Sequence, residues 1–167
     1  MKKLLSLLLF ATLFACKSGP GPDAIDLKAE EAAIDQVFET LFTAIDERNL
    51  EKFASVLADD GLFLGTDPEE QFPKDSMVAS WSLMMQMPEI PPLEYINEPL
   101  VRIQPDGKTA VVVLQFHWDL FTPLPLRQSF WMVKKDTTWL IDFFDFSFVP
   151  ENELIPLLNA SMLAEGE

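Results

Sequence analysis

The sequence predicts an α+β domain in which N-terminal helices pack on one face of a curved, mainly antiparallel sheet. Two observations support this prediction. Apolar residues recur at helical spacing between residues 27 and 85. Segments rich in β-branched and aromatic residues, separated by turn residues, fill the chain from 93 to 148. Helices that precede the strands in this way are typical of an α+β fold.

The first residues have the pattern of an export signal. Lys2 and Lys3 precede an apolar run, residues 4–14, that is too short to span a bilayer. The run leads into Cys16, the single cysteine of the chain, and "LFAC" at 13–16 resembles the lipobox of a bacterial lipoprotein. We therefore expect a lipoprotein signal at 1–15, a lipidated Cys16 and a flexible tether over 16–26. The alternative is an ordinary cleaved signal that leaves a free thiol.

Composition and charge limit the partners. The chain has 167 residues, of which 49% are apolar, enough for one domain with a real core. Without residues 1–15, ten basic residues remain against 27 acidic ones, a net charge of −17. Such a charge repels phosphate backbones, so we expect no nucleic-acid partner. We expect the domain to cover residues 27–150, with a C-terminal tail over 151–167.

The first predicted helix starts near Leu27 and has one apolar face, formed by Ile34, Phe38, Leu41 and Ile45. A break at Arg48 is followed by a second helix with Asn49 as its N-cap, and we expect that helix to extend through Leu57. A short apolar run between two glycines, residues 62–64, predicts a buried strand. A third helix begins near Pro73 and ends before Pro88.

The strands are predicted from residue 93 onward. The segments 93–104 and 108–121 flank "PDG", which favours a hairpin. The segments 127–135 and 139–148 flank Asp136 and Thr137, which form a second turn. The tail either forms a short amphipathic helix or frays.

These elements and three local sequences resemble the nuclear transport factor 2-like (NTF2-like) superfamily and, within it, the SnoaL-like proteins. The three sequences are "AIDERNLEKFASVLADDGLFLGTDPEE", "LRQSFWMVKKDTTW" and "WLIDFFDFSFVP". The resemblance covers about residues 27–150. It implies a cone-shaped fold with a pocket at one end, and homodimers that form through the outer face of the sheet. Relatives include isomerases, dehydratases, cyclases and association domains, so the fold alone does not give the function.

The resemblance also locates a departure from the family. Two histidines that relatives often carry fall on Phe143 and Asp145 here, while Ser147 is retained. If the turn pairs Lys134 with Trp139, Asp145 shares a face with Phe143 and Phe130, and the resemblance directs that face into the cone. A β-bulge would exchange the two faces.

Asp142 points to the face opposite Asp145, because the two are three residues apart on a strand. Its expected role is an ion pair with Arg127.

Candidate site residues follow from polar and aromatic side chains within the apolar strands. Asp145 and His117, the single histidine, are the candidate acid/base residues. For Asp145 the alternative of equal weight is a structural carboxylate satisfied by its neighbours. For His117 the favoured explanation is a partly exposed strand residue near an end of the sheet. The residues expected to contact a ligand are Trp81, Tyr95, Trp118, Phe130, Phe143 and Asp145. We expect no metal and no cofactor, because one histidine and one cysteine make a poor ligand set.

Three functions remain open. The first is binding of a small apolar or amphipathic molecule in the cone, without catalysis. The second is a cofactor-independent isomerase, dehydratase or hydrolase that uses Asp145 or His117. The third is a dimeric protein-interaction module. In each case the resemblance to lipoproteins implies an exported, membrane-anchored protein that faces the periplasm or lies on the cell surface.

Overall fold

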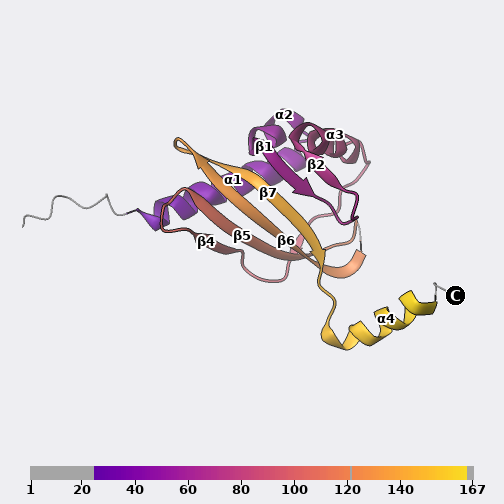
Figure 1. Ribbon diagram of the computed structural model, residues 1–167. Coiled ribbons are helices and arrows are strands. Elements are labelled where there is room, and N and C mark those ends of the chain that lie inside the picture. The colour runs from indigo at the N-terminus through magenta and orange to yellow at the C-terminus, as the bar shows by residue number, and fades with distance from the viewer. Residues whose placement is uncertain (1–24, 121, 165–167) are drawn as a thin grey trace, which may run out of the picture.

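The computed structural model describes residues 25–120 and 122–164, and these form the predicted α+β fold (Figure 1). Three helices lie on one face of a seven-stranded sheet, and we call that face the inner face. They are α1 (Leu27–Asp46), α2 (Leu50–Ser55) and α3 (Lys74–Met84). The predicted signal peptide, the lipidated Cys16 and most of the tether lie outside the described residues.

Helix α1 forms because its apolar residues repeat along one face and its N-terminus is capped. The Asp26 carboxylate accepts a hydrogen bond from the backbone N–H of Ala29 at 3.2 Å. The helix buries Ile34, Val37, Phe38, Leu41 and Ala44 against the sheet. The ring of Phe38 meets Phe130 edge-on, with centroids 4.8 Å apart. This contact joins the middle of α1 to the inner face of the sheet.

Helix α2 is shorter than the sequence pattern predicts. Asn49 caps it as expected, since its side chain accepts a hydrogen bond from the backbone N–H of Lys52 at 2.9 Å. The helix ends at Ser55, however, and Leu57 begins strand β1 (Leu57–Leu64). Leu57 pairs with Ile141 of the sheet and is almost fully buried. A tertiary contact therefore overrides the helical spacing of that leucine.

The sheet has the strand order β2-β1-β7-β6-β5-β3, and β4 also pairs with β5. Strand β1 runs parallel to β7, and the other pairs are antiparallel. Both predicted turns contain a residue with positive φ, Gly107 and Asp136. The remaining strands are β2 (Gln71–Pro73), β3 (Glu94–Tyr95), β4 (Leu100–Ile103), β5 (Thr109–Trp118), β6 (Thr122–Lys135) and β7 (Thr138–Phe148).

The register of β6 and β7 changes at a bulge. Lys134 pairs with Trp139 as predicted, and Met132 pairs with Ile141. The next pair along is Trp131 with Phe143, so Asp142 is an extra residue in β7. From Phe143 to the end of β7, each side chain therefore points to the face opposite the one expected.

The residue pairs after the bulge show that the inner and outer faces of β7 are exchanged. Phe144 lies opposite the buried Phe130 on the inner face, and Asp145 lies opposite Ser129 on the outer face. The expectation that Phe143 and Asp145 point into the cone is therefore wrong. The physical reason is the single extra residue, because side chains alternate with a period of two.

The C-terminal segment consists of a short turn of helix, η1 (Asn152–Leu154), and helix α4 (Ile155–Ala164). In Figure 1 this helix stands away from the body of the domain. Its apolar side chains are exposed, for example Leu157 at 68% and Met162 at 74%. Among the described residues, no helix is both long and apolar enough to cross a membrane.

A charged cluster joins α1 to the β6–β7 hairpin. Lys134 Nζ lies 2.6 and 2.7 Å from the two carboxylate oxygens of Glu30. The indole N–H of Trp139 donates to the same carboxylate at 2.8 Å. The hydrogen bond from Lys134, and then that from Trp139, hold the pKa of Glu30 below its usual range. This cluster fixes the N-terminal end of the helix to the sheet.

Replacing Glu30 tests that attachment. We expect Glu30→Gln to lower the free energy of unfolding by about 1.5–3 kcal/mol at pH 7, the usual range for hydrogen bonds to a charged group. Because the folded-state pKa is lowered, the stabilisation is complete above the ordinary value of 4.5 and is lost as the pH falls through the lower value. Urea unfolding across this range measures it. The exposed neighbour Glu31→Gln is the control, and equal effects of the two variants contradict the prediction.

Asp142 should behave in the opposite way. Partial burial, and then the nearby Asp60, raise its pKa, and Lys135 offsets only part of this. We expect Asp142→Asn to stabilise the protein at pH 7, because the carboxylate is charged where the fold disfavours charge. The gain should shrink as the pH falls through the raised pKa towards 3.8. Thermal unfolding checks this against the exposed Asp119→Asn, and a destabilised Asp142→Asn overturns it.

Candidate functional site

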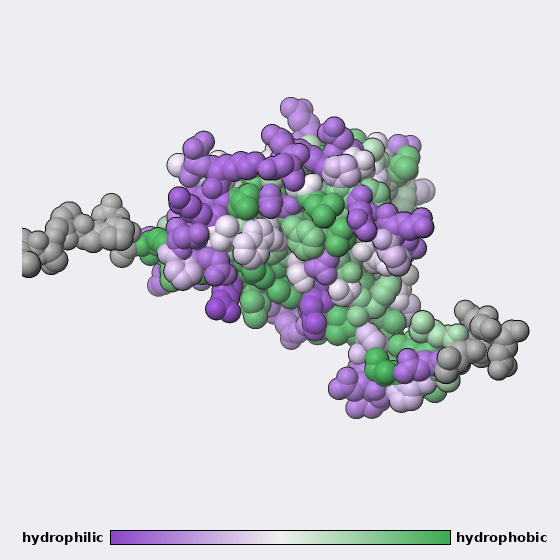
Figure 2. All heavy atoms as spheres, viewed as in Figure 1, coloured by the Kyte–Doolittle hydropathy of each residue, from purple (hydrophilic) through white to green (hydrophobic). Residues whose placement is uncertain are grey.

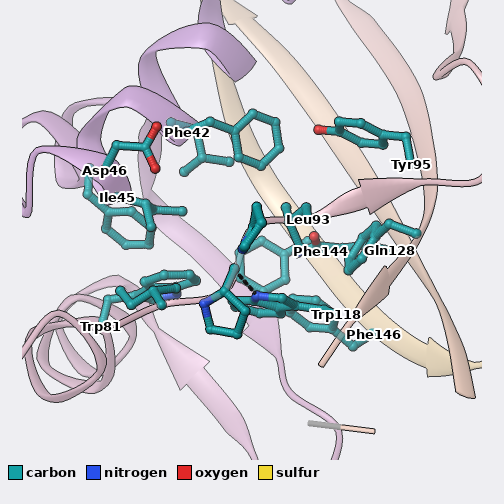
Figure 3. Close-up of a pocket in the computed structure, with 16 residues that line it drawn as sticks. Phe42, Ile45, Asp46, Trp81, Leu93, Tyr95, Trp118, Gln128, Phe144 and Phe146 are labelled. Carbon is teal, nitrogen blue, oxygen red and sulfur yellow. Dashed lines mark hydrogen bonds between the residues drawn. The ribbon is translucent and has the colours of Figure 1, made fainter. Parts of the chain in front are cut away.

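A cavity of about 350 Å³ lies between the helices and the inner face of the sheet. The C-terminal half of α1 and the ends of β5, β6 and β7 surround it, and the segment after α3 forms one wall (Figure 3). Its lining residues are Leu41, Phe42, Ile45, Asp46, Phe53, Trp81, Ile90, Pro91, Pro92, Leu93, Tyr95, Phe116, Trp118, Gln128, Phe144 and Phe146.

Aromatic side chains make up half of this lining and hold one another in place. Trp81 and Trp118 stack with their centroids 6.3 Å apart and their planes at 16°. The ring of Phe53 also packs on Trp81, with centroids 5.0 Å apart. The indole N–H of Trp118 donates a hydrogen bond to the carbonyl of Pro91 at 2.7 Å. The ordered aromatic wall therefore extends into the segment after α3.

Gln128 supplies a polar group inside the cavity. It is 8% exposed, and among the described residues it is the buried residue with a polar side chain. Its side-chain amide forms no hydrogen bond with the described residues. Every described side-chain N or O atom that is inaccessible to solvent does have a hydrogen-bond partner, so the unpaired amide of Gln128 must be accessible. The amide is therefore accessible from the cavity, where it can donate to a bound molecule and accept from it.

Two ionisable groups border the same space. Burial raises the pKa of Tyr95, so its hydroxyl stays protonated and remains a donor. Asp46 is the last residue of α1, and its carboxylate points into the cavity beside Phe42 (Figure 3). Within the described chain this carboxylate has no hydrogen bond and no ion pair.

Arg48 holds the wall formed by the segment after α3. It adopts a positive φ of 56° between α1 and α2. Its Nη1 donates to the carbonyl of Met85, and its Nη2 donates to that of Pro88 at 3.3 Å. These carbonyls follow the C-terminal end of α3, where a cation is favoured. The guanidinium thus keeps residues 85–93 against the opening of the cone.

A smaller cavity of about 100 Å³ adjoins the first. The two share Trp81, Trp118 and Phe146 as lining residues. The aromatic pair therefore separates a large chamber from a small one.

The structure places some of the expected ligand-contacting residues at the cavity and others elsewhere. Trp81, Tyr95 and Trp118 line it. Phe130 is a core residue beneath it, packed against Phe38 and Phe144. Phe143 lies on the outer face because of the bulge. Whether the three lining residues bind a ligand stays a prediction.

Neither candidate acid/base residue reaches the cavity. Asp145 is on the outer face, where it accepts a hydrogen bond from Ser147 at 3.3 Å. His117 pairs with Glu94 and is exposed, because it alternates with the buried Phe116 and Trp118. The two residues belong to the outer surface of the sheet.

The expected ion pair between Arg127 and Asp142 is also wrong. Arg127 pairs in register with Ser147, and no ion pair joins it to Asp142 in the described chain. Asp142 lies instead near Asp60 and Lys135. Nowhere in the described part of the chain do three or more His, Cys, Asp or Glu side chains come together in a way that could hold a metal ion.

Sequence reasoning missed Asp46 and Gln128. Gln128 gave a signal, because it shares a strand face with Phe130, and the resemblance directs that face into the cone; it was nevertheless not named as a site residue. Asp46 reads in the sequence as one of several acidic residues on the polar side of α1. Only the position of the helix end shows that its side chain borders a cavity.

Comparison with known proteins identifies relatives of the whole domain. The family model described as "SnoaL-like domain" matches residues 34–151. A search of curated proteins finds no match.

Three solved structures show the same fold. An NTF2-like protein of unknown function from Pseudomonas putida KT2440 has 19% identity and a TM-score of 0.60, over 75% of this chain and 91% of that one. An NTF2-like protein from Cytophaga hutchinsonii ATCC 33406 has 18% identity and a TM-score of 0.58, over 71% and 98%. One from Silicibacter pomeroyi DSS-3 has 13% identity and a TM-score of 0.58, over 75% and 100%.

Proposed function

Because the chain belongs to the SnoaL-like domain family, whose fold surrounds an internal space, we propose that it binds a small apolar or amphipathic molecule in its cavity without catalysing a reaction. The cavity itself supports this proposal. It has the size of small-molecule sites, which begin at about 300 Å³, and the combination of apolar walls with few polar groups that such sites share.

The polar groups of the cavity suit recognition. Gln128 lies at its base and can orient a carbonyl or hydroxyl group, and Tyr95 offers a donor at its edge. Aromatic walls give a large contact area with little loss of side-chain freedom. A ligand with an apolar body and a few hydrogen-bonding groups fits this arrangement.

The catalytic alternative loses its two candidates. A general base must come within hydrogen-bond reach of the proton that it removes, directly or through one water. Asp145 and His117 belong to the outer face and do not line the cavity. Binding is therefore the function that the geometry supports best.

Native mass spectrometry of the purified protein, combined with displacement of Nile red, tests binding. We expect a co-purified small molecule, or saturable dye binding that apolar molecules displace. Gln128→Leu should keep dye binding but weaken an alkanol competitor about five- to tenfold, the effect of one lost hydrogen bond. Gln115→Leu on the outer face is the matched control. If the wild-type protein neither retains a molecule nor binds the dye, the proposal fails.

The outer face of the sheet suggests a second contact, between two copies of the chain. Leu62, Phe143, Trp131 and Val111 follow one another across β1, β7, β6 and β5. Figure 2 shows apolar side chains gathered over this face, with hydrophilic ones around them. Patches of this kind mark interaction sites. We propose a homodimer through this face, and the same native mass spectra report its mass.

We also propose that the protein is exported and anchored through lipidated Cys16, because a basic start, an apolar run and a lipobox-like "LFAC" precede it. Cells that express the full chain with an alkyne-modified fatty acid should yield labelled protein. Cys16→Ser should carry no label and leave the membrane fraction. An unlabelled wild-type chain contradicts the anchor.

A further inference from the structure

Building on the proposed binding function, we infer that the cavity selects a cationic amphiphile, an alkylammonium compound, whose charged head lies against the Asp46 carboxylate. Three features of the described residues lead to this ligand class. They are the charges of the lining, the position of Asp46 on its helix and the aromatic side chains around it.

The charged side chains that line the two cavities are acidic. Among the described residues, no Lys, Arg or His side chain borders either cavity, whereas a carboxylate borders each of them, Asp46 in the large one and Glu70 in the small one. The whole chain carries a formal charge of −15. An anionic amphiphile, such as a fatty acid, meets no counter-ion here, while a cation is attracted towards the opening.

Asp46 is poorly placed for the stability of its own helix. It is the last residue of α1, where the helix dipole is negative and a carboxylate is disfavoured. The last turn of the helix contains no basic residue to offset it. A cation bound beside this carboxylate would interact favourably both with its charge and with the C-terminal end of the helix.

Arg48 and Lys52, the two basic residues that follow Asp46 most closely in the sequence, bind to other groups. The guanidinium of Arg48 donates to the carbonyls of Met85 and Pro88. Lys52 pairs with Glu47 at 3.2 Å. Asp46 is therefore left without a protein counter-ion in the described chain, which distinguishes it from Glu30 and Asp59, both of which pair with lysines.

Aromatic rings complete the surroundings of a cationic head. Figure 3 shows the Asp46 carboxylate turned towards the space framed by Phe42 above and Trp81 below, with Tyr95 across the cavity. The faces of such rings attract ammonium groups also at exposed positions, such as those of Asp46 and Tyr95. The alkyl chain of the ligand then lies along Phe116, Phe144 and Phe146 in the apolar interior.

Matched probes test the charge preference. Octyltrimethylammonium, octanol and octanoate share one chain length and differ in their head groups, and each competes with Nile red for the full protein at pH 7. We expect the ammonium compound to bind about tenfold more tightly than octanol, with octanoate the weakest of the three. The preference should decrease as the salt concentration rises from about 0.02 to about 0.5 M, because salt screens the attraction between the ammonium group and the carboxylate.

Two variants separate the site from the overall charge. Asp46→Asn should reduce the preference for the ammonium compound to about twofold or less while octanol binding is retained. Asp35→Asn, an exposed carboxylate on the same helix, removes the same charge and should leave the preference intact. Thermal unfolding without ligand should show Asp46→Asn to be at least as stable as the wild type, because the unfavourable helix-end charge is gone.

The outcomes distinguish the two proposals. If the dye binds and octanol displaces it as well as the ammonium compound does, the cation inference is overturned and the binding function stands. Equal losses in Asp46→Asn and Asp35→Asn also overturn it, since the preference would then reflect net charge alone. If the dye binds but the ammonium compound does not displace it, the cation inference is likewise overturned; if no dye binds and no molecule is retained, the binding function itself fails.

Discussion

The extra residue at Asp142 in β7 determines the chemistry of both faces of the sheet. On one side of it, Trp139 and Ile141 are buried on the inner face, and on the other side Phe144 and Phe146 take that place. Without the bulge, Phe143, Asp145 and Ser147 would point into the cone, and the cavity would hold a carboxylate and a hydroxyl at its base. With it, the base is aromatic, and Gln128 of β6 is the polar group that remains there. The bulge thus keeps the Asp145 carboxylate and the Ser147 hydroxyl on the outer face of the sheet, away from the cavity.

The packing of α1 depends on that same register. Phe144 contacts Phe130 at 5.8 Å between centroids, and Phe130 receives the edge of Phe38 from the helix. The Glu30 cluster holds the N-terminal end of α1 against the closing hairpin. These two attachments fix the direction of the helix, so its C-terminal end projects over the cavity. The position of Asp46 at the border of the cavity follows from this.

The wall formed by the segment after α3 is held in place by a different kind of contact. Residues 85–93 contain no regular structure before β3, and they stay in place through hydrogen bonds from Arg48 and Trp118 to their carbonyls. Because these bonds are made to the backbone, side chains of the segment such as Ile90 and Leu93 remain directed to the cavity. A packed aromatic interior is therefore combined with a wall that is held by a few hydrogen bonds to its backbone.

The sequence by itself determined the α+β class, the order of the first three helices and the long strands, both turns, the N-cap at Asn49 and the pairing of Lys134 with Trp139. The short strand β2 and the division of 93–104 into β3 and β4 were not predicted. It also gave the three aromatic residues Trp81, Tyr95 and Trp118 that line the cavity. These depend on local periodicity, capping and turn chemistry, which act over a few residues. Only the tertiary structure decided the end of α2 at Ser55, the bulge at Asp142, and hence the outward positions of Asp145 and Phe143. Each of these is set by contacts between segments far apart in the chain, and a one-residue change in register reverses every side chain beyond it.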